Sequence, residues 1–389
     1  MEALLDIRRK TAPQQPQWDD SAQVQRVREE LAARPALVSV EDTRRLRDLL
    51  AEVAAGKANV VQAGDCAEDP AECAFGYIAR KAGLLDVLAG TMKMITHKPV
   101  VRSARIAGQF AKPRSRPTEW VGDVELPVYR GHMVNCPEPD PDGRRPDPGR
   151  MLSGYLAASD AMQHLGWWRP SERLTIDTPV WTSHEALLLD YELPMMRRDD
   201  AGRWLLTSTH WPWIGERTRQ VDGAHVALLA EVVNPVACKV GPAMPVGELL
   251  TLCERLDPGR EPGRLTFIAR MGADAVADRL PPLVAAAKAA GHPVIWLTDP
   301  MHGNTVAGPD GLKTRLLDTI VREVELFQCA VRAGGGIPGG LHLETTPDEV
   351  TECVRNESHL DEVGTKYTSF CDPRLNPSQA VSVVTAWRG

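Results

Sequence analysis

Two short stretches decide the fold of this chain: Pro235-Val236-Ala237-Cys238-Lys239 and Leu265-Thr266-Phe267-Ile268-Ala269-Arg270. Each is a mostly apolar run of the length of one buried strand, and each has a cation at its end. A charge at the end of a buried strand carries a large desolvation cost unless another group pairs with it. We therefore interpret both stretches as strands whose last residue faces a binding site.

The same pattern recurs along the chain. Further apolar runs lead to Glu216 with Arg217, to His302 and to Glu344. With these runs, the eight predicted strands lie at residues 59–63, 99–106, 179–183, 207–215, 235–238, 265–269, 294–301 and 340–343. The predicted helices between them lie at residues 74–94, 151–166, 221–233, 246–256, 280–290 and 312–333. Strands that alternate with helices indicate a parallel α/β sheet, and charged residues gathered at the strand ends favour a (β/α)8 TIM barrel.

The composition narrows the class of protein. The 389 residues suffice for one large barrel or two ordinary domains. The net charge of −7 argues against a generic nucleic-acid binder, because such proteins present basic surfaces. The sequence shows neither a signal peptide nor a run of apolar residues long enough to span a membrane. Eight scattered cysteines without a secretory signal favour reduced thiols, so we expect a cytoplasmic protein.

The N-terminal part has a different pattern from the rest. Residues 21–33 carry a helical stripe, and a second helix begins after Ser39 and ends near Gly56. We expect residues 1–56 to form a short helical extension and residues 57–389 to form the catalytic barrel. The segment 136–150 is rich in Pro, Asp and Arg, which predicts an exposed connection.

Four residues at predicted strand ends or in the final loop are metal-ligand types: Cys66, His302, Glu344 and Asp372. A thiolate beside an imidazole and two carboxylates suits Mn, Fe, Co or Zn better than Mg or Ca. Taken singly, a buried cysteine or a lone histidine is more often an ordinary core residue. The four at one mouth indicate a divalent-metal site.

A second set consists of cations that gather in the same regions: Arg105, Lys112, Arg114, Arg217, Lys239 and Arg270. Arg and Lys bind phosphate and carboxylate groups, although each could instead pair with a neighbouring acid. Lys239 and Arg270 follow apolar runs with no acid beside them in sequence. Two cationic clusters would suit two phosphorylated substrates or one bisphosphate, and Trp213 would either wall this pocket or pack in the core.

Six stretches together resemble the type II 3-deoxy-D-arabino-heptulosonate 7-phosphate (DAHP) synthases. They are GDCAE at 64–68, RIAGQFAKPRS at 105–115, TSHEALLL at 182–189, WIGERTRQ at 213–220, DPMHGNT at 299–305 and CDPRLN at 371–376. These motifs are long and specific, and they occur in order from about Val60 to the C-terminus. The length and the stretch 208–231 are most similar to the short branch found in phenazine and related secondary-metabolite clusters.

The resemblance implies a transferase that condenses phosphoenolpyruvate with erythrose 4-phosphate to give DAHP and phosphate. It implies metal ligands at Cys66, His302, Glu344 and Asp372, with Mn²⁺ or Co²⁺ expected and Fe²⁺ or Zn²⁺ as alternatives. It places phosphoenolpyruvate against Arg105, Trp213, Glu216, Arg217, Lys239 and Arg270, and erythrose 4-phosphate against Lys112, Arg114 and Ser115. Lys112 and Glu216 would be catalytic, as proton donor and as water-positioning residue. We expect a homodimer.

One position departs from the family pattern. The family usually has Asp after Tyr-Arg-Gly, whereas this chain has His132 after Tyr129-Arg130-Gly131. An imidazole there suggests an alternative function, condensation of phosphoenolpyruvate with a different or amino-substituted aldose phosphate. A third hypothesis, from another class, is a non-catalytic barrel that binds a partner pathway enzyme. The complete ligand and cation sets argue against it.

Overall fold

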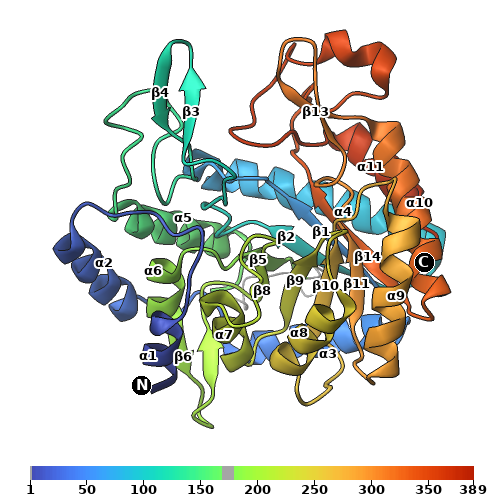
Figure 1. Cartoon of the computed structure of the whole chain (residues 1–389), viewed down its shortest axis with the longest axis horizontal. Coiled ribbons are helices and arrows are strands. Elements are labelled where there is room, and N and C mark those ends of the chain that lie inside the picture. The colour runs from blue at the N-terminus through green and yellow to red at the C-terminus, as the bar shows by residue number, and fades with distance from the viewer. Residues whose placement is uncertain (1, 169–178) are drawn as a thin grey trace.

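The computed structural model describes residues 2–168 and 179–389. Eight parallel strands close into a barrel in the order β1-β14-β11-β10-β9-β8-β5-β2, as Figure 1 shows in part. Their bounds are β1 Asn59–Gly64, β2 Val100–Arg105, β5 Trp181–Glu185, β8 Trp211–Ile214, β9 Val236–Val240, β10 Leu265–Ala269, β11 Ile295–Thr298 and β14 Pro338–Glu344. The predicted (β/α)8 barrel is therefore confirmed.

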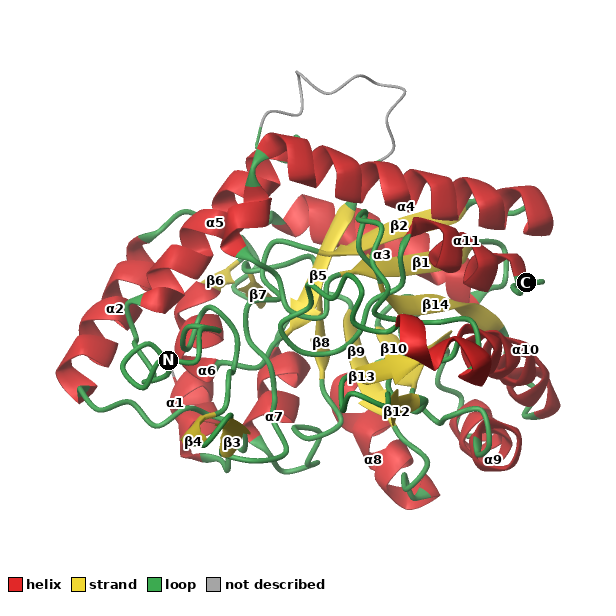
Figure 2. Cartoon of the chain, turned by 90° about the horizontal axis from the view of Figure 1, so that it is seen from above, coloured by secondary structure: helices red, strands yellow, loops and turns green. Residues whose placement is uncertain are grey.

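Helices surround this barrel (Figure 2). Those that follow the barrel strands are α4 Phe75–Thr96, α5 Arg150–His164, α6 Leu189–Glu192, α7 Ala224–Glu231, α8 Val246–Leu256, α9 Val276–Ala289, α10 Leu317–Ala333 and α11 Pro377–Thr385. Three more precede β1, namely α1 Glu2–Arg9, α2 Ser21–Ala33 and α3 Val40–Ala54. The Ser39 side chain caps α3 by accepting a hydrogen bond from the Asp42 amide, as the sequence predicts. No helix in the described part of the chain is long and apolar enough to cross a membrane.

Within the described residues, three β-hairpins interrupt the alternation of strands and helices. They are β3 Thr118–Val121 with β4 Val124–Pro127, β6 Met196–Arg198 with β7 Trp204–Leu206, and β12 Thr305–Ala307 with β13 Lys313–Arg315. The β3–β4 and β12–β13 hairpins lie above one end of the barrel, and β6–β7 lies near the other (Figure 1). None of the three was predicted, because each of their strands has only three or four residues, too few to show a clear apolar pattern.

Some predicted boundaries are wrong. The helix predicted at 312–333 begins at Leu317, because β13 occupies the residues before it. The first 56 residues contain α1 in addition to the two predicted helices. The segment 136–150 is not exposed throughout, since Arg144 is buried and hydrogen-bonds to the carbonyls of Pro127, Pro137 and Glu138. The division at residue 56 stays a prediction.

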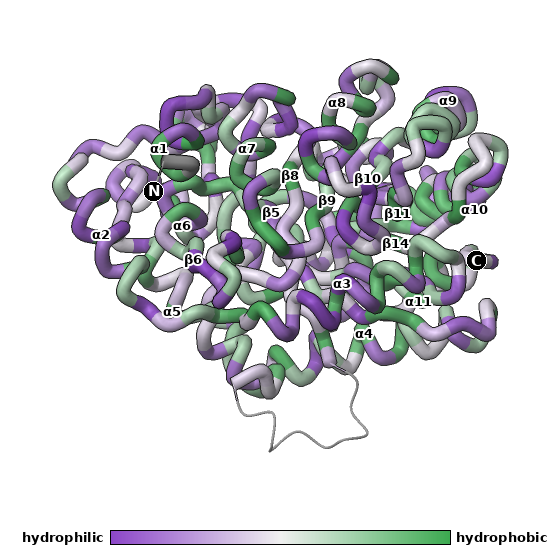
Figure 3. The backbone as a smooth tube through the Cα atoms, turned by 90° about the horizontal axis from the view of Figure 1, so that it is seen from below, coloured by the Kyte–Doolittle hydropathy of each residue, from purple (hydrophilic) through white to green (hydrophobic). Residues whose placement is uncertain are grey.

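The register of β1 brings the first site residues together. Gly64, the last residue of β1, pairs with Arg105 of β2 on one side and with Glu344 of β14 on the other. Gly64 has φ +145, and a Cβ there would lie 2.9 Å from the Arg105 carbonyl oxygen, so a side chain would not fit. Figure 3 shows the hydropathy of the chain, with hydrophilic stretches along outer elements such as α2.

The segment between α1 and α2 lies against loops at the carboxyl ends of the strands. The Gln14 side chain accepts a hydrogen bond from the Arg114 amide at 2.8 Å. Gln15 donates to the Leu187 carbonyl at 2.9 Å and accepts from the Leu189 amide at 3.0 Å. The N-terminal segment therefore connects the loop after β2 with the loop after β5.

Candidate active site

A cavity of about 280 Å³ opens at the carboxyl ends of the barrel strands. The predicted residues that line it are Arg105, Lys112, Arg114, Ser115, Trp213, Glu216, Arg217, Lys239, Arg270, His302 and Asp372. The structure therefore brings both cation groups and two of the four predicted metal ligands to one cavity. Cys66 and Glu344 lie just beneath it, both at 1 % exposure or less.

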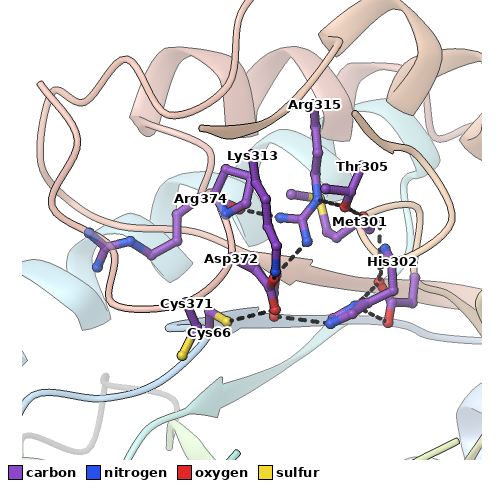
Figure 4. Close-up of polar contacts among 12 residues, drawn as sticks. Cys66, Met301, His302, Thr305, Lys313, Arg315, Cys371, Asp372 and Arg374 are labelled. Atoms are coloured by element: carbon purple, nitrogen blue, oxygen red, sulfur yellow. Dashed lines mark hydrogen bonds and ion pairs between the residues drawn. The ribbon is translucent and has the colours of Figure 1, made fainter. Parts of the chain in front are cut away.

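Three of the four predicted metal ligands form one cluster. Ligand atoms of Cys66, Glu344 and Asp372 all lie within 4.8 Å of one another, and the Cys66 thiol donates to Asp372 Oδ2 at 3.4 Å. Figure 4 shows Asp372 between Cys66 and His302. His302 is outside the compact cluster, but its Nε2 lies 3.4 Å from Glu344 Oε1.

The imidazole of His302 is oriented by a second carboxylate. Asp299 Oδ2 lies 2.8 Å from His302 Nδ1, which leaves Nε2 to face Glu344. A histidine held by a carboxylate through one ring nitrogen is the usual arrangement for a metal ligand that binds through the other. Burial lowers the pKa of His302 to about 4, although Asp299 opposes this shift, so the ring is neutral and its nitrogen lone pair is available.

The donor set fits a divalent cation. Burial alone would raise the pKa of Glu344, but the guanidinium groups of Arg315 and Arg105 hold it below its usual range. Burial raises the pKa of the Cys66 thiol, to which its neighbours Cys371 and Glu344 add. A cation bound among these donors would instead lower the pKa of the Cys66 thiol, because coordination favours the thiolate. The mixture of sulfur, nitrogen and oxygen donors suits Mn, Fe, Co or Zn.

Arg105 is held rigidly at the floor of the cavity. Its Nε donates to the Asp65 carbonyl at 2.9 Å, and its Nη2 to Glu344 Oε1 at 3.0 Å. Its Nη1 lies 2.7 Å from Nε2 of the buried His342. The guanidinium also lies 5.3 Å from the centre of the Trp213 ring, within the range of a cation–π contact. Trp213 is thus both a core residue and a wall of the cavity.

Lys239 lies in β9, and Arg270 directly follows β10. Lys239 Nζ lies 2.8 Å from Asp299 Oδ2, the carboxylate that also orients His302. Burial lowers the pKa of Lys239, and Asp299 opposes this effect. Arg270 Nη2 donates to the His302 carbonyl at 2.8 Å. These contacts couple the cations of β9 and β10 to the predicted metal site.

The second cation group lies in the loop after β2. Lys112 Nζ lies 3.8 Å from Glu344 Oε1 and 3.7 Å from Asp372 Oδ2. Arg114 Nη2 contacts Glu119 at 3.2 Å, so the alternative that a cation pairs with a neighbouring acid is correct for this residue. Ser115 Oγ accepts a hydrogen bond from Arg217 Nη2 at 2.7 Å, which connects the two cation groups.

Seven cavity residues were not predicted, of which five have polar or charged side chains: Gln109, Glu185, Thr305, Lys313 and Arg315. Arg315 is fully buried and donates to Glu344 Oε2 at 2.9 Å, while Lys313 Nζ lies 2.8 Å from Asp372 Oδ1 (Figure 4). Both belong to β13, which has no apolar run to signal it. Gln109 and Glu185 lie within two of the quoted motifs, so those motifs were the signal that could have found them.

His132 does not line the cavity. Its Nδ1 lies 2.7 Å from the Tyr129 hydroxyl, and its ring packs edge-on against Phe370 with centroids 5.2 Å apart. Burial lowers its pKa, although Asp69 opposes this. The departure from the family pattern therefore lies outside the cavity lining, in contact with Tyr129 and Phe370.

Comparison with known proteins decides the family. A model of the class-II DAHP synthetase family matches residues 3–172 and 161–386. A "probable phospho-2-dehydro-3-deoxyheptonate aldolase" from Pseudomonas fluorescens is 59% identical over 391 residues, which covers 100% of this chain and 98% of that protein. The chain belongs to the class-II DAHP synthetase family. The prediction that it is an enzyme of this family, a transferase, is therefore confirmed.

Other relatives agree with this assignment. A phospho-2-dehydro-3-deoxyheptonate aldolase from Streptomyces coelicolor is 39% identical over 422 residues, covering 96% of this chain and 93% of that protein. A solved structure of phospho-2-dehydro-3-deoxyheptonate aldolase from Francisella tularensis aligns with a TM-score of 0.56 at 14% identity, covering 96% of this chain and 99% of that one. The second likeness supports the fold alone. The roles of individual residues in this class-II DAHP synthetase stay predictions.

Proposed function

We propose that this enzyme condenses phosphoenolpyruvate with erythrose 4-phosphate to give DAHP and phosphate, the first step of the shikimate pathway. The observation that carries the proposal is one cavity lined by two groups of cations beside a cluster of metal donors. The names of the relatives agree with this reaction. We also propose, from the resemblance to the short branch, that the product feeds secondary metabolism. We further propose that the enzyme works as a cytoplasmic homodimer.

The floor of the cavity would bind phosphoenolpyruvate. Arg105, Lys239 and Arg270 offer guanidinium and ammonium groups held in place by buried partners, with Arg217 and Glu216 at the rim. These cations would hold the phosphate and carboxylate against the flat ring of Trp213. Because their positions are fixed before binding, little ordering cost remains when the substrate arrives.

The loop after β2 would bind the aldose phosphate. Arg114, Ser115 and the shared Arg217 would hold its phosphate, and Lys112 would lie near the aldehyde end beside Glu344 and Asp372. Two anionic substrates repel each other in solution. Fixing each by its own phosphate brings C3 of phosphoenolpyruvate to the aldehyde carbon in one orientation.

Cys66, His302, Glu344 and Asp372 would hold the divalent metal, which when bound supplies Lewis-acid polarisation of the aldehyde. The Lys112 ammonium is close enough to this site to donate a proton from Nζ to the oxygen that develops negative charge when the new C–C bond forms. A water then adds at C2 of the former phosphoenolpyruvate, and Glu216 would help to position it. Loss of phosphate by C–O cleavage completes the reaction.

The two alternative functions receive less support. An amino-substituted acceptor would need a different group in the cavity wall, whereas His132 contacts Tyr129 and Phe370 instead. A non-catalytic barrel would have no need to keep charged groups buried at such cost.

The deciding experiment measures phosphate release from phosphoenolpyruvate with Mn²⁺ or Co²⁺ across a panel of aldose phosphates. We expect erythrose 4-phosphate to give the highest kcat/KM. Faster turnover with an amino-substituted or longer aldose would replace this proposal with the alternative acceptor. For the pathway assignment, deleting the gene should abolish a secondary metabolite and leave growth without aromatic amino acids intact.

A further inference from the structure

Glu185 is a buried carboxyl in the cavity without a hydrogen-bond partner. It is the last residue of β5, and 8% of its surface is exposed. Its Oε1 is completely buried and unpaired, and no hydrogen bond or ion pair to either carboxyl oxygen occurs among the described residues. Burying a carboxyl without a donor is costly. Such a group is expected where a ligand or a water supplies the missing donor.

The backbone around Glu185 holds the carboxyl in this position. The Glu185 amide donates to Gln109 Oε1 at 2.9 Å, and the Ala186 amide donates to the Trp213 carbonyl at 2.9 Å. A Cβ at Gly215 would lie 2.1 Å from Glu185 Oε1. The lack of a side chain at Gly215 therefore leaves the space that the Glu185 carboxyl occupies. Gly215 directly precedes Glu216 in the chain.

Cations surround Glu185 without neutralising it by contact. Burial raises its pKa, and Lys239, Lys112, Arg217 and Arg105 partly oppose this shift from more than ion-pair distance. Each of these four cations is already assigned to a substrate phosphate, a carboxylate or the aldehyde oxygen. Glu185 is the carboxyl that remains free among them.

The carboxylate of Glu216, unlike that of Glu185, already has hydrogen-bond partners. Its Oε1 accepts hydrogen bonds from Arg219 Nη2 at 2.9 Å and from Arg219 Nε at 3.1 Å, and Arg219 also contacts Glu248. Two guanidinium hydrogen bonds to one oxygen hold the Glu216 carboxylate in place. Its Oε2 is buried and unpaired and can accept one further hydrogen bond. Glu216 can thus orient a water, whereas Glu185 is better suited to take its proton.

We propose that Glu185 is the proton acceptor for the water that adds to C2 of the condensed phosphoenolpyruvate. This inference rests on the proposed function. The water oxygen forms the bond to C2, one of its O–H bonds breaks, and that proton moves to the Glu185 carboxylate while the electron pair stays on oxygen. When the C2–O bond to phosphate breaks, Glu185 returns the proton to the departing phosphate. The second water proton passes to Lys112 Nζ, which replaces the proton given to the former aldehyde oxygen.

A competing role for Glu185 is to bind a hydroxyl group of the aldose phosphate. The two roles differ in their kinetic signature. A proton acceptor affects the rate of the bound complex, and its removal lowers kcat. A hydroxyl-binding residue affects ground-state binding, and its removal raises the KM of the aldose phosphate with kcat largely kept.

The test uses three variants of the metal-loaded enzyme: Glu185→Gln, Glu185→Asp and Glu185→Ala. We expect Glu185→Gln to lower kcat for phosphate release by about 100-fold or more, the usual contribution of general acid–base catalysis. Both KM values should stay within about three-fold, since the variant still fills the same space. Glu185→Asp should retain part of the rate. Added formate should restore turnover of Glu185→Ala in proportion to its concentration.

Two measurements test whether each variant still folds and binds phosphoenolpyruvate. Thermal unfolding and calorimetric binding of phosphoenolpyruvate to each variant show that the cavity is intact. Glu216→Gln is the matched comparison: because Glu216 would orient the water and border phosphoenolpyruvate, this variant should lower kcat and raise the KM of phosphoenolpyruvate, and it should show no response to formate. A normal kcat in Glu185→Gln, or a folded, phosphoenolpyruvate-binding Glu185→Ala that formate does not restore, would overturn the assignment of Glu185 alone. If the wild-type enzyme released no phosphate with any aldose phosphate, the proposed function itself would fail, and this role with it.

Discussion

Arg374 Nη1 donates to Asp65 Oδ1 at 2.9 Å, and this ion pair joins the end of β1 to the segment before α11. Arg374 also donates to both carboxylate oxygens of the buried Glu352. Asp65 directly precedes Cys66, and Arg374 follows Asp372 by two residues. The pair therefore fixes two of the predicted metal donors relative to each other, although they are far apart in the chain.

Replacing Arg374 should destabilise the protein strongly. Arg374→Met would leave Asp65 and Glu352, both at most 1% exposed, without one of their partners. Removing one member of a buried ion pair costs about 3–5 kcal/mol. Urea-induced unfolding should show this loss in the free energy of unfolding. As a control, Lys57→Met removes an exposed ion pair with Glu52 and should leave the unfolding free energy almost unchanged.

Metal removal should abolish turnover. The cluster of Cys66, Glu344 and Asp372 has the donors for a divalent ion, and the proposed reaction needs the aldehyde polarised. A chelator should stop phosphate release, and Mn²⁺ or Co²⁺ should restore it. His302→Ala should bind less metal, as elemental analysis would show. Full activity in a verified metal-free sample would remove the metal from the proposed function.

The two cation groups should affect different substrates. Arg270→Ala should raise the KM of phosphoenolpyruvate by about 10- to 100-fold, the effect of losing one charged hydrogen bond, with little change for the aldose phosphate. Arg114→Ala should do the reverse. Steady-state kinetics with each substrate varied in turn measures both. If either variant weakened both substrates equally, the division of the cavity would be wrong.

Oxidation of the metal-free enzyme should join two cysteines. The thiols of Cys66 and Cys371 contact each other beside Asp372 (Figure 4). Without a metal on Cys66, an oxidant can join them in a disulfide that blocks metal binding. Peptide mapping after air oxidation should find this pair, and Cys371→Ser should keep its ability to rebind metal. Two free thiols in oxidised, inactive protein would contradict the prediction.

Stability should depend on pH through a carboxyl outside the cavity. Burial raises the pKa of Glu323 to about 7, although Asn304 donates a hydrogen bond to it. The folded state therefore favours the protonated acid, and this contribution to stability is lost as the pH rises through about 7. Glu323→Gln mimics the protonated form. We expect the free energy of unfolding of Glu323→Gln, relative to that of wild type, to increase by an amount on the order of 2 kcal/mol between pH 5 and pH 8. Urea unfolding at each pH measures this difference.

The barrel could be predicted because most of its strands are buried throughout and several of them carry a continuous apolar run. The runs before Lys239 and Arg270 coincide with β9 and β10. The hairpins could not be predicted in this way, since β12 is exposed throughout and β13 begins with the exposed Lys313. Lys313 and Arg315 reach the cavity only because this hairpin folds over the strand ends, an arrangement that depends on tertiary packing.

The sequence predicts which residues gather at the site better than it predicts the contacts between them. Residue types at strand ends indicated which side chains would meet, and the cavity contains or borders all of them. The sequence could not indicate that Arg114 donates a hydrogen bond to Glu119, nor that Glu185 lacks a hydrogen-bond partner. Both facts depend on distances in three dimensions, which the order of residues along the chain does not fix.

The contacts of Gln14 and Gln15 have a practical consequence for work with this protein. These residues brace the loop that carries Arg114 against the loop that begins at Leu187. Trimming the first twenty residues to aid crystallisation would therefore alter the end of the cavity that Arg114 lines, even though none of the described residues 2–20 lines the cavity. An affinity tag is better placed at the C-terminus, where α11 ends far from these loops (Figure 1).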